Sequence, residues 1–310
     1  MAAKLPVLLV GATGMVGYEI GKALAQKDNL AVKALVREHT ASNPHSQEKL
    51  LHLQKMGVQL VHGDLLVPES LATVCHGIET VVSVVNGDAD VVVNGQMNLI
   101  KAAEAAGVKR FIPSDFSVDY RKLDWGDNYS LNFRKAIYQA LQGNRKLSHT
   151  LILNGILTES LFSPFGVVFD LHKGLFKYWG DGNTAFDTTT IHDVAAYTAE
   201  AVLDEDLANT ALEVAGDTVT MKALKTLFEA NTIQVLAERN LGSVAELQRW
   251  IEQKREIARS MRDYLSQQSH YTLVSGKGKL EHVMNDRYPH IQPQSLKSYI
   301  REHYNTMILW

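Results

Sequence analysis

Apolar and polar positions alternate in a regular order along the first half of the chain. Short apolar runs, each suited to one buried strand, occur at residues 7–10, 31–36, 58–62, 80–85, 110–112 and 150–153. Between them, apolar residues recur at helical spacing over residues 50–56, 71–75, 94–106 and 131–141, and Gly107 follows where a left-handed helix cap suits glycine. Strands that alternate with helices indicate a doubly wound parallel sheet, so we predict an α/β protein.

Beyond Asn154 the pattern is less regular. Residues 211–214 form another apolar run that is expected to return to the sheet, and Ser243 and Glu246 have the spacing of a capping box ahead of a charged helix. The predicted apolar side of that helix consists of Leu247, Ile251, Ala258, Met261 and Leu265. We expect a first domain over residues 1–156 and a smaller, mostly helical lobe over residues 157–310, with some later segments packing back onto the first domain.

Three glycines follow the first predicted strand, in the order Gly-Ala-Thr-Gly-Met-Val-Gly, and lead into a first predicted helix whose apolar face is formed by Ile20, Ala23 and Leu24. Glycine suits this turn because the backbone must approach a pyrophosphate and the helix must pack close to the strand. The helix N-terminus then offers free N–H groups and a partial positive charge to phosphate. The order predicts a Rossmann-type dinucleotide site in preference to a plain glycine-rich turn, with these contact residues: Gly11, Thr13, Gly14, Met15, Val16 and Gly17.

The residue about twenty positions after the glycines distinguishes the two nicotinamide cofactors. An NAD-binding chain usually carries an acid there, whereas this chain has Arg37. A guanidinium suits a 2′-phosphate and nearby Lys49 adds a second cation, so we predict NADP(H), although an ordinary surface role explains Lys49 about as well. Asp64 and Leu65 end the third strand and are counted as cofactor contacts; the carboxylate either accepts from the adenine amino group or caps a turn.

Composition narrows the possible partners. The chain has 310 residues and a formal net charge of -3, so it lacks the basic excess that nucleic-acid binding normally requires. Cys75 is the only cysteine and the 12 histidines contain no His-x-x-x-His pair, so neither a disulfide nor a metal site is predicted. Since no apolar run reaches the roughly 18 residues of a membrane span, we expect a cytoplasmic protein, either a monomer or a homodimer, that acts on a small molecule.

A Tyr-x-x-x-Lys pair is the usual acid–base unit of short-chain dehydrogenases. The sequence has one match, Tyr18 with Lys22, but it falls in the first helix beside the glycine loop and away from where a nicotinamide reaches, so we treat it as accidental. On the helix where the pair belongs, Lys135 is present and Leu131 occupies the tyrosine position. The usual tyrosine acid is therefore missing from the sequence.

Several segments together resemble the isoflavone reductase-like branch of the atypical short-chain dehydrogenases, which includes pinoresinol-lariciresinol, phenylcoumaran benzylic ether and eugenol-forming reductases, and also the NmrA-like proteins. The matching segments are Gly-Ala-Thr-Gly at 11–14 with Gly17, Leu-Val-Arg-Glu at 35–38, Val-His-Gly-Asp-Leu at 61–65, Val-Lys-Arg-Phe-Ile-Pro-Ser-Asp-Phe at 108–116, Phe-Arg-Lys-Ala at 133–136, and Gly-Asp-Gly at 180–182 with Asp193. They follow in the family order over roughly the first two thirds of the chain, which is more specific than any single motif.

The resemblance implies an NADPH-dependent reductase that transfers a hydride to an aromatic or conjugated small molecule. It implies that Lys135 supplies or relays the proton beside the cofactor, and that Arg37 and Lys49 hold the 2′-phosphate. It also implies that Asn86 and Gly87 lie along the nicotinamide ribose.

Two features depart from the family pattern. The family usually reads Ser-Glu-Phe-Gly after the fifth strand, whereas residues 114–117 read Ser-Asp-Phe-Ser. Residues 235–268 do not match the reductases of this branch. The loop over the nicotinamide and the identity of the substrate are therefore open.

In a doubly wound sheet the ligand lies beyond the carboxyl ends of the strands. Asn154 follows the strand at 150–153 and is counted with the cofactor contacts. Aromatic residues that follow these strand ends are predicted to line the substrate site: Phe116, Tyr120, Phe162, Phe165 and Phe169. Core packing explains the same residues, and for any single one it is the stronger explanation.

An alternative function is an NmrA-like sensor that binds the dinucleotide and regulates a partner without turnover. Lys135 favours the enzyme, because a sensor needs no proton donor. A sugar-nucleotide epimerase is disfavoured by Leu131 at the position of its tyrosine.

Overall fold

The computed structural model describes residues 3–38, 43–163 and 168–307. The chain folds into two compact units. Unit 1 comprises Met1–Phe116, Phe133–Ile152 and Val194–Leu212, and unit 2 comprises Ser117–Asn132, Leu153–Asp193 and Glu213–Trp310. The assignment of cofactor binding to residues 1–156 and of substrate binding to residues 157–310 stays a prediction.

A seven-stranded sheet is the centre of unit 1, with its strands in the order β11-β6-β5-β4-β1-β2-β3. The neighbouring pairs from β3 to β6 are parallel. The strands are β1 (Leu5–Val10), β2 (Leu30–Val36), β3 (Gln59–His62), β4 (Thr80–Ser83), β5 (Arg110–Ile112), β6 (Ser148–Leu153) and β11 (Thr210–Glu213). The order reverses direction between β1 and β4, and in such sheets the crevice at this switch point binds the ligand.

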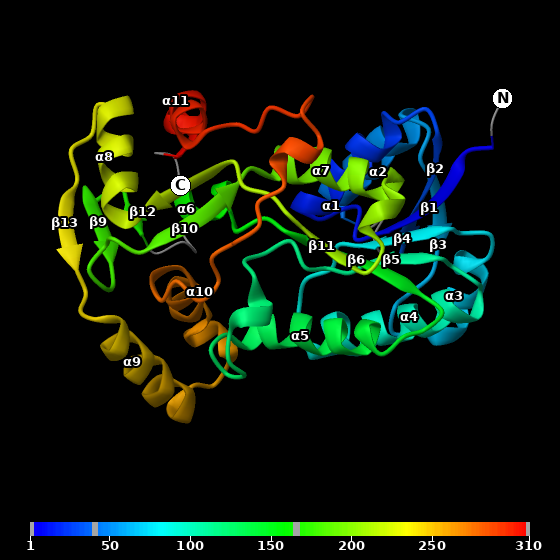
Figure 1. Ribbon diagram of the computed structural model, residues 1–310, viewed down its shortest axis with the longest axis horizontal. Helices are drawn as coiled ribbons and strands as arrows, with labels where there is room; N and C mark the ends of the chain where they lie inside the picture. Colours follow the sequence, from blue (N-terminus) through cyan, green and yellow to red (C-terminus); the bar gives the residue numbers. More distant parts are fainter. Residues whose placement is uncertain (1–2, 39–42, 164–167, 308–310) are drawn as a thin grey trace. The chain divides into compact units, whose positions relative to one another are not determined.

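Helices cover both faces of this sheet. Figure 1 shows α1, α2 and α7 on one face and α3, α4 and α5 on the other. Their bounds are α1 (Met15–Ala25), α2 (Pro44–Lys55), α3 (Pro68–Cys75), α4 (Gln96–Ala105), α5 (Tyr129–Gln142) and α7 (Ile191–Leu203). Gly107 follows α4 with a φ of 76°, the left-handed conformation predicted for it. A π-helical turn, Asp90–Gly95, leads into α4 and was not evident from the sequence pattern.

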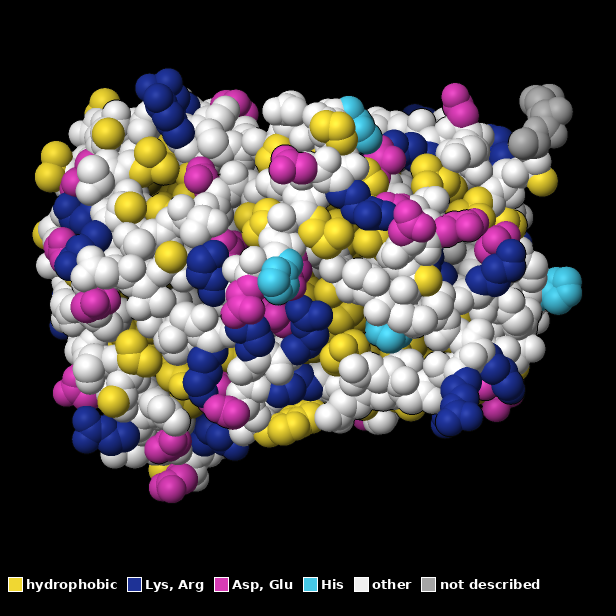
Figure 2. Space-filling model, viewed as in Figure 1, with side chains coloured by type: hydrophobic (Ala, Val, Ile, Leu, Met, Phe, Trp, Pro, Cys, Tyr) yellow, Lys and Arg dark blue, Asp and Glu magenta, His cyan; other side chains and the backbone are white. Residues whose placement is uncertain are grey.

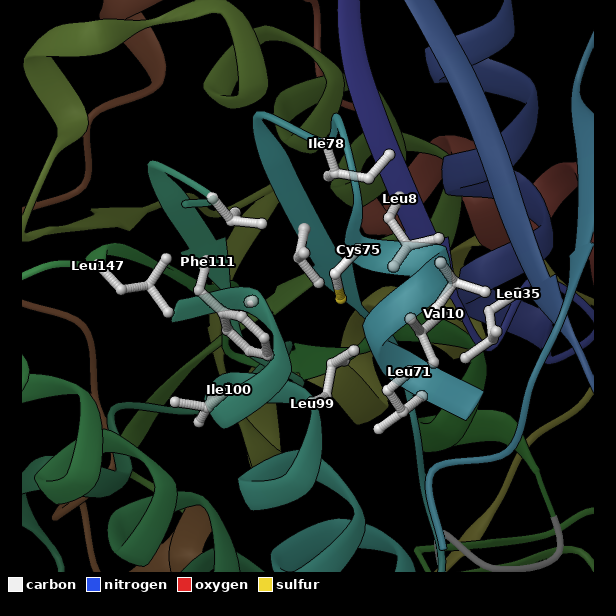
Figure 3. Packing of buried hydrophobic residues seen from close by; sticks show 14 of the residues in the cluster. Leu8, Val10, Leu35, Leu71, Cys75, Ile78, Leu99, Ile100, Phe111 and Leu147 are labelled. Carbon is white, nitrogen blue, oxygen red and sulfur yellow. The ribbon is translucent and has the colours of Figure 1, made fainter. Parts of the chain in front are cut away.

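One hydrophobic core of unit 1 lies between the sheet and the helices on the α3 side. Apolar side chains of β1 and β5 meet those of α3 and α4 there, as Figure 3 shows: Leu8, Val10, Leu71, Cys75, Leu99, Ile100 and Phe111. Burial raises the pKa of the Cys75 thiol to about 11, so this cysteine stays protonated and packs as a small apolar side chain.

Unit 2 combines helices with two three-stranded sheets, in the orders β12-β10-β7 and β13-β9-β8. The strands are β7 (Ile156–Leu157), β8 (Phe169–Asp170), β9 (Leu175–Tyr178), β10 (Ala185–Thr189), β12 (Asp217–Thr220) and β13 (Ala237–Asn240). The helices are α6 (Thr158–Phe162), α8 (Met221–Asn231), α9 (Val244–Ile257), α10 (Leu265–Val274) and α11 (Leu296–Met307). The sequence predicted a mostly helical lobe and did not reveal the small sheets, because two- to five-residue strands are too short for a clear alternation.

The helix predicted after Ser243 needs one correction. The capping box is present, because Ser243 Oγ accepts from the N–H of Glu246 and the Glu246 carboxylate accepts from the N–H of Ser243. Helix α9 nevertheless ends at Ile257, so Met261 and Leu265 belong to later helical segments and not to its apolar side. A repeating apolar pattern had concealed this helix boundary.

Basic and acidic side chains are interspersed over the molecular face in Figure 2, in keeping with the small net charge. That face therefore presents no extended field of one sign. In the described part of the chain, no helix is long and apolar enough to cross a bilayer.

Candidate cofactor-binding site

The turn from β1 into α1 requires glycine at two positions, one in the loop and one in the first turn of the helix. Gly11 has a φ of +90°, and a Cβ atom there would lie 2.1 Å from the carbonyl oxygen of Val84. At Gly17, a Cβ would lie 2.2 Å from the carbonyl oxygen of Gly11. These contacts allow the loop to pack closely against the residue that follows β4, and the first turn of α1 to pack closely against the loop.

Gly14 has a different environment. A Cβ added to it would meet only the Gly11 carbonyl oxygen among the described atoms, at 3.4 Å. Gly14 is the N-cap of α1 without a side-chain cap, Met15 beside it is 64% exposed, and the first turn of this fully described helix holds no acidic residue. Internal packing therefore does not require glycine here, and the helix N-terminus stays open to an anion.

Two cavities adjoin this loop. The first, of about 330 Å³, is bordered by the ends of β1, β2 and β4 and includes Gly11, Thr13, Gly14, Arg37, Asp64, Leu65 and Asn86 in its lining. The second, of about 660 Å³, shares Thr13, Arg37, Gly63 and Asp64 with the first and extends past Glu38 to the start of α2. Seven of the predicted contacts are thus brought together at the switch point of the sheet.

The two predicted cations differ in position. Arg37 is exposed and lines both cavities. Lys49 is half-buried on α2, and its Nζ donates to the carbonyl oxygen of Thr13 at 3.1 Å. The described residues that line the two cavities do not include Lys49.

Asp64 has the turn-capping role that the sequence left as one of two possibilities. Its Oδ1 accepts from the N–H of Leu66 at 2.9 Å, and its own N–H donates to Ser70 Oγ at 2.9 Å. Because Asp64 also lines both cavities, contact with an adenine stays a prediction beside the observed turn.

The remaining predicted cofactor contacts are more scattered. Asn86 lines the first cavity, and its Oδ1 accepts from the N–H of Gly87 at 3.0 Å. Val16 and Gly17 lie in the first turn of α1, where Gly17 is buried. Asn154 is fully buried in unit 2, and its Oδ1 has no hydrogen-bonding partner within the described ranges.

Lys135 is half-buried on α5. The helix is capped by Asn128, whose Oδ1 accepts from the N–H groups of Ser130 and Leu131 at 3.1 and 3.2 Å. Arg134, its neighbour, donates from Nε to the carbonyl oxygen of Asp115 at 2.8 Å, which ties α5 to the segment after β5. Lys135 does not line either of the two cavities described above.

The predicted substrate residues divide into different environments. Phe116 follows β5 with a φ of 31°, an uncommon conformation for a residue with a side chain. Tyr120 has no exposed surface, and Phe162 stacks on Phe169 with a centroid distance of 4.9 Å inside an aromatic cluster of unit 2. Phe165 lies outside the described residues. Packing thus accounts for Tyr120 and Phe162, and the substrate role of the group stays a prediction.

The sequence did not single out several residues that line the cavities. They include Leu35, Val36, Gly63, Val84 and Val85 around the first cavity, and Asn43, Ser46 and Ser70 around the second. The first group lies at or directly after the carboxyl ends of predicted strands, so strand ends alone could have indicated it.

The parallel sheet, the glycine loop and the cavity at its switch point define a Rossmann-type α/β protein, which confirms the predicted fold class. The chain belongs to the NmrA-like family, whose family model matches residues 3–261. Among its relatives is phenylcoumaran benzylic ether reductase TP7 of Nicotiana tabacum, 29% identical over 257 residues, which cover 79% of this chain and 78% of that protein.

Solved structures show the same fold. A crystal structure of isoflavone reductase has a TM-score of 0.83 at 22% identity and covers 97% of this chain and 99% of its own. The binary complex of leucoanthocyanidin reductase with NADPH from Vitis vinifera has a TM-score of 0.82 at 19% identity and covers 98% of this chain and 100% of its own. The family model confirms the family predicted from the sequence, and the solved structures show that its fold is shared.

Proposed function

We propose that this protein is an NADPH-dependent reductase that transfers a hydride to an aromatic or conjugated small molecule. The observation that carries the proposal is Gly14: it lines the first cavity at the open N-terminus of α1, where internal packing would admit a side chain. A ligand that approaches the backbone closely, such as a pyrophosphate, explains why glycine occupies this position.

The cavities suit a dinucleotide with an additional phosphate. The N-terminus of α1 faces the anion with N–H groups and the positive end of the helix dipole. Arg37 borders both cavities and offers a planar, permanently charged donor to a 2′-phosphate. Glu38 also lines the second cavity, and its carboxylate would repel a phosphate. The attraction between Arg37 and the phosphate must therefore exceed this repulsion.

Bound NADPH supplies the hydride, and the chain must then supply a proton. Hydride addition to an electron-poor carbon of a carbonyl, quinone methide or conjugated alkene leaves negative charge on the substrate, usually on oxygen. The Lys135 ammonium is the group we assign as donor or relay, because the tyrosine of the usual pair is replaced by Leu131. Capping by Asn128 and the bond between Arg134 and Asp115 hold the helix that carries it.

The substrate class rests on the relatives and on the aromatic residues. The relatives are named as reductases of phenylcoumaran benzylic ethers and isoflavones. Phe116, which follows the end of β5, is the substrate contact that we propose.

The test begins with NADPH and NADH titrations of the purified protein, followed by NADPH oxidation with quinones, aryl ketones and lignin-type dimers. We expect tighter binding of NADPH and turnover of at least one aromatic substrate. Arg37→Gln should raise the Kd for NADPH by roughly 10- to 100-fold and leave the Kd for NADH nearly unchanged. Arg239→Gln, on exposed β13 of unit 2, is the matched control.

The outcomes separate the alternatives. Equal affinity for the two cofactors contradicts the NADPH assignment. Tight NADPH binding without turnover of any compound in the panel favours a regulatory sensor over a reductase.

A further inference from the structure

The first turn of α4 carries a buried amide that joins two strand ends. Gln96 is 1% exposed; its Oε1 accepts from the backbone N–H of Ser114 at 3.1 Å, and its Nε2 donates to the carbonyl oxygen of Val92 at 2.7 Å. Ser114 follows β5, and its Oγ donates to the carbonyl oxygen of Val85, which follows β4, at 2.6 Å. Gln96 therefore connects the carboxyl ends of β4 and β5 to the π-helical turn Asp90–Gly95.

Asn98, two residues later in α4, holds a different strand end. Its Nδ2 donates to the carbonyl oxygen of Leu65 at 2.9 Å, and Leu65 follows β3. The chain before α4 approaches Leu65 closely, because a Cβ added to Gly95 would lie 3.0 Å from the Cβ of Leu65. The start of α4 thus packs against this strand end as well as bonding to it.

The partners of these bonds form part of the first cavity. Leu65 and Val85 line it, and so does Val91 of the π-helical turn. Gln96 and Asn98 are not among the described residues that line either cavity. The two amides therefore hold residues of the cavity wall in place without lining the cavity themselves.

The strand ends that the two amides hold belong to different halves of the sheet. β3 lies with β1 and β2 on one side of the switch point, and β4 lies with β5 and β6 on the other. In a doubly wound sheet each half receives one mononucleotide of the dinucleotide. Arg37 follows β2, so in the proposed function the half with β3 receives the adenosine and its 2′-phosphate, and the half with β4 receives the nicotinamide mononucleotide.

We infer that Gln96 and Asn98 are positioning residues for opposite halves of the cofactor: Gln96 holds the wall beside the nicotinamide mononucleotide, and Asn98 holds the wall beside the adenosine. The inference rests on the proposed function. Each residue acts through the strand end that it holds. Without the amide, a backbone group of that wall loses its partner and its fixed position. A ligand must then order the wall when it binds, which weakens its affinity.

Adenosine 2′,5′-bisphosphate separates the two halves, because it carries the adenosine and the 2′-phosphate and lacks the nicotinamide. The experiment measures the Kd of this fragment and of NADPH for each variant. Gln96→Met should raise the Kd of NADPH roughly tenfold and leave that of the fragment within a factor of about two. Asn98→Ala should raise both constants by a similar factor, roughly three- to tenfold. A general loss of stability would not separate the two ligands in this way.

Two further variants complete the comparison. Ser114→Ala is a milder change than Gln96→Met, because it removes only the bond to Val85, and it should raise the Kd of NADPH alone by about threefold. Asn94→Ala is the control for Asn98→Ala. Asn94 is exposed, and its Nδ2 donates to Asp90 Oδ1 at 3.0 Å within the same turn, so both constants should stay within about twofold.

The outcomes distinguish the inference from the proposed function. If the wild type binds both compounds, an equal loss of both affinities in Gln96→Met overturns the inference, and so does unchanged binding of NADPH. A loss confined to NADPH in Asn98→Ala, or an equal effect of Asn94→Ala, also overturns it. Failure of the wild type to bind either compound contradicts the proposed function itself, and the inference with it.

Discussion

Gln96 accepts a hydrogen bond from the backbone N–H of Ser114, with 3.1 Å between Oε1 and N. Its amide nitrogen donates to the carbonyl oxygen of Val92 at 2.7 Å, so one buried side chain joins the π-helical turn before α4 to the end of β5. Ser114 in turn donates from Oγ to the carbonyl oxygen of Val85 at the mouth of the first cavity. The carboxyl ends of β4 and β5 are thereby locked together.

Gln96→Met keeps the length of this side chain and removes both of its hydrogen bonds. The buried N–H of Ser114 then loses its partner, and we expect the free energy of unfolding to fall by about 1–3 kcal/mol. Urea denaturation measures the change. Gln54→Met, at an exposed site of α2, is the control and should have little effect; equal stability of the two variants would contradict the role of Gln96.

Substitutions at two glycines of the loop should separate folding from ligand binding. In Gly17→Ala the Cβ would lie 2.2 Å from a backbone oxygen, so we expect a loss of about 1–3 kcal/mol or more in stability. In Gly14→Ala the atom nearest to the new Cβ is 3.4 Å away, so the protein should fold. The Kd for NADPH should rise at least roughly tenfold, a loss of about 1.4 kcal/mol in binding free energy. Thermal melts and NADPH titrations distinguish the two, and normal NADPH affinity of Gly14→Ala would remove the main support for the proposed function.

Lys135→Ala should affect turnover and spare the fold. If its ammonium donates or relays the proton, kcat should fall by roughly 10²- to 10⁴-fold with little change in the melting temperature. Steady-state kinetics with an active substrate from the panel measure this. Lys101→Ala, at an exposed site of α4, controls for the loss of a charge; full activity of Lys135→Ala would exclude the assigned role.

His270 should make stability depend on pH. It is 2% exposed in α10, and burial lowers its pKa to about 4. In the unfolded chain the same imidazole has a pKa near 6.5, so the unfolded state takes up the proton first as the pH falls. The contribution of neutral His270 to the free energy of unfolding is therefore complete above pH 6.5 and decreases as the pH falls, by about 3 kcal/mol at pH 4.

The test compares how the melting temperatures of two variants and of the wild type depend on pH. The melting temperature of His270→Gln should fall less between pH 7 and pH 4 than that of the wild type. His192→Gln, at an exposed site, should follow the wild type. Parallel profiles for all three proteins would show that His270 does not titrate on unfolding in this range.

The sequence alone was sufficient to predict the parallel sheet, the glycine loop and the family. Buried strands are near-continuous apolar runs, and glycine at positions 11 and 17 is imposed by backbone contacts of about 2 Å that any side chain would violate. Such requirements restrict which residue types a position can hold, so they leave a direct record in the sequence. The cation at position 37 was likewise visible, because its distance from the glycines along the chain fixes its place at the end of β2.

Other features required the tertiary structure. The sequence placed Phe162 and Phe169 among the aromatic residues after a predicted strand end. Their stacking on one another is tertiary packing, which the sequence pattern does not reveal. The small sheets of unit 2 pair strands that are too short to show their own period. Lys49 illustrates the same limit: its position in the sequence does not reveal the hydrogen bond from its ammonium to the carbonyl oxygen of Thr13, which arises only when α2 packs beside the glycine loop.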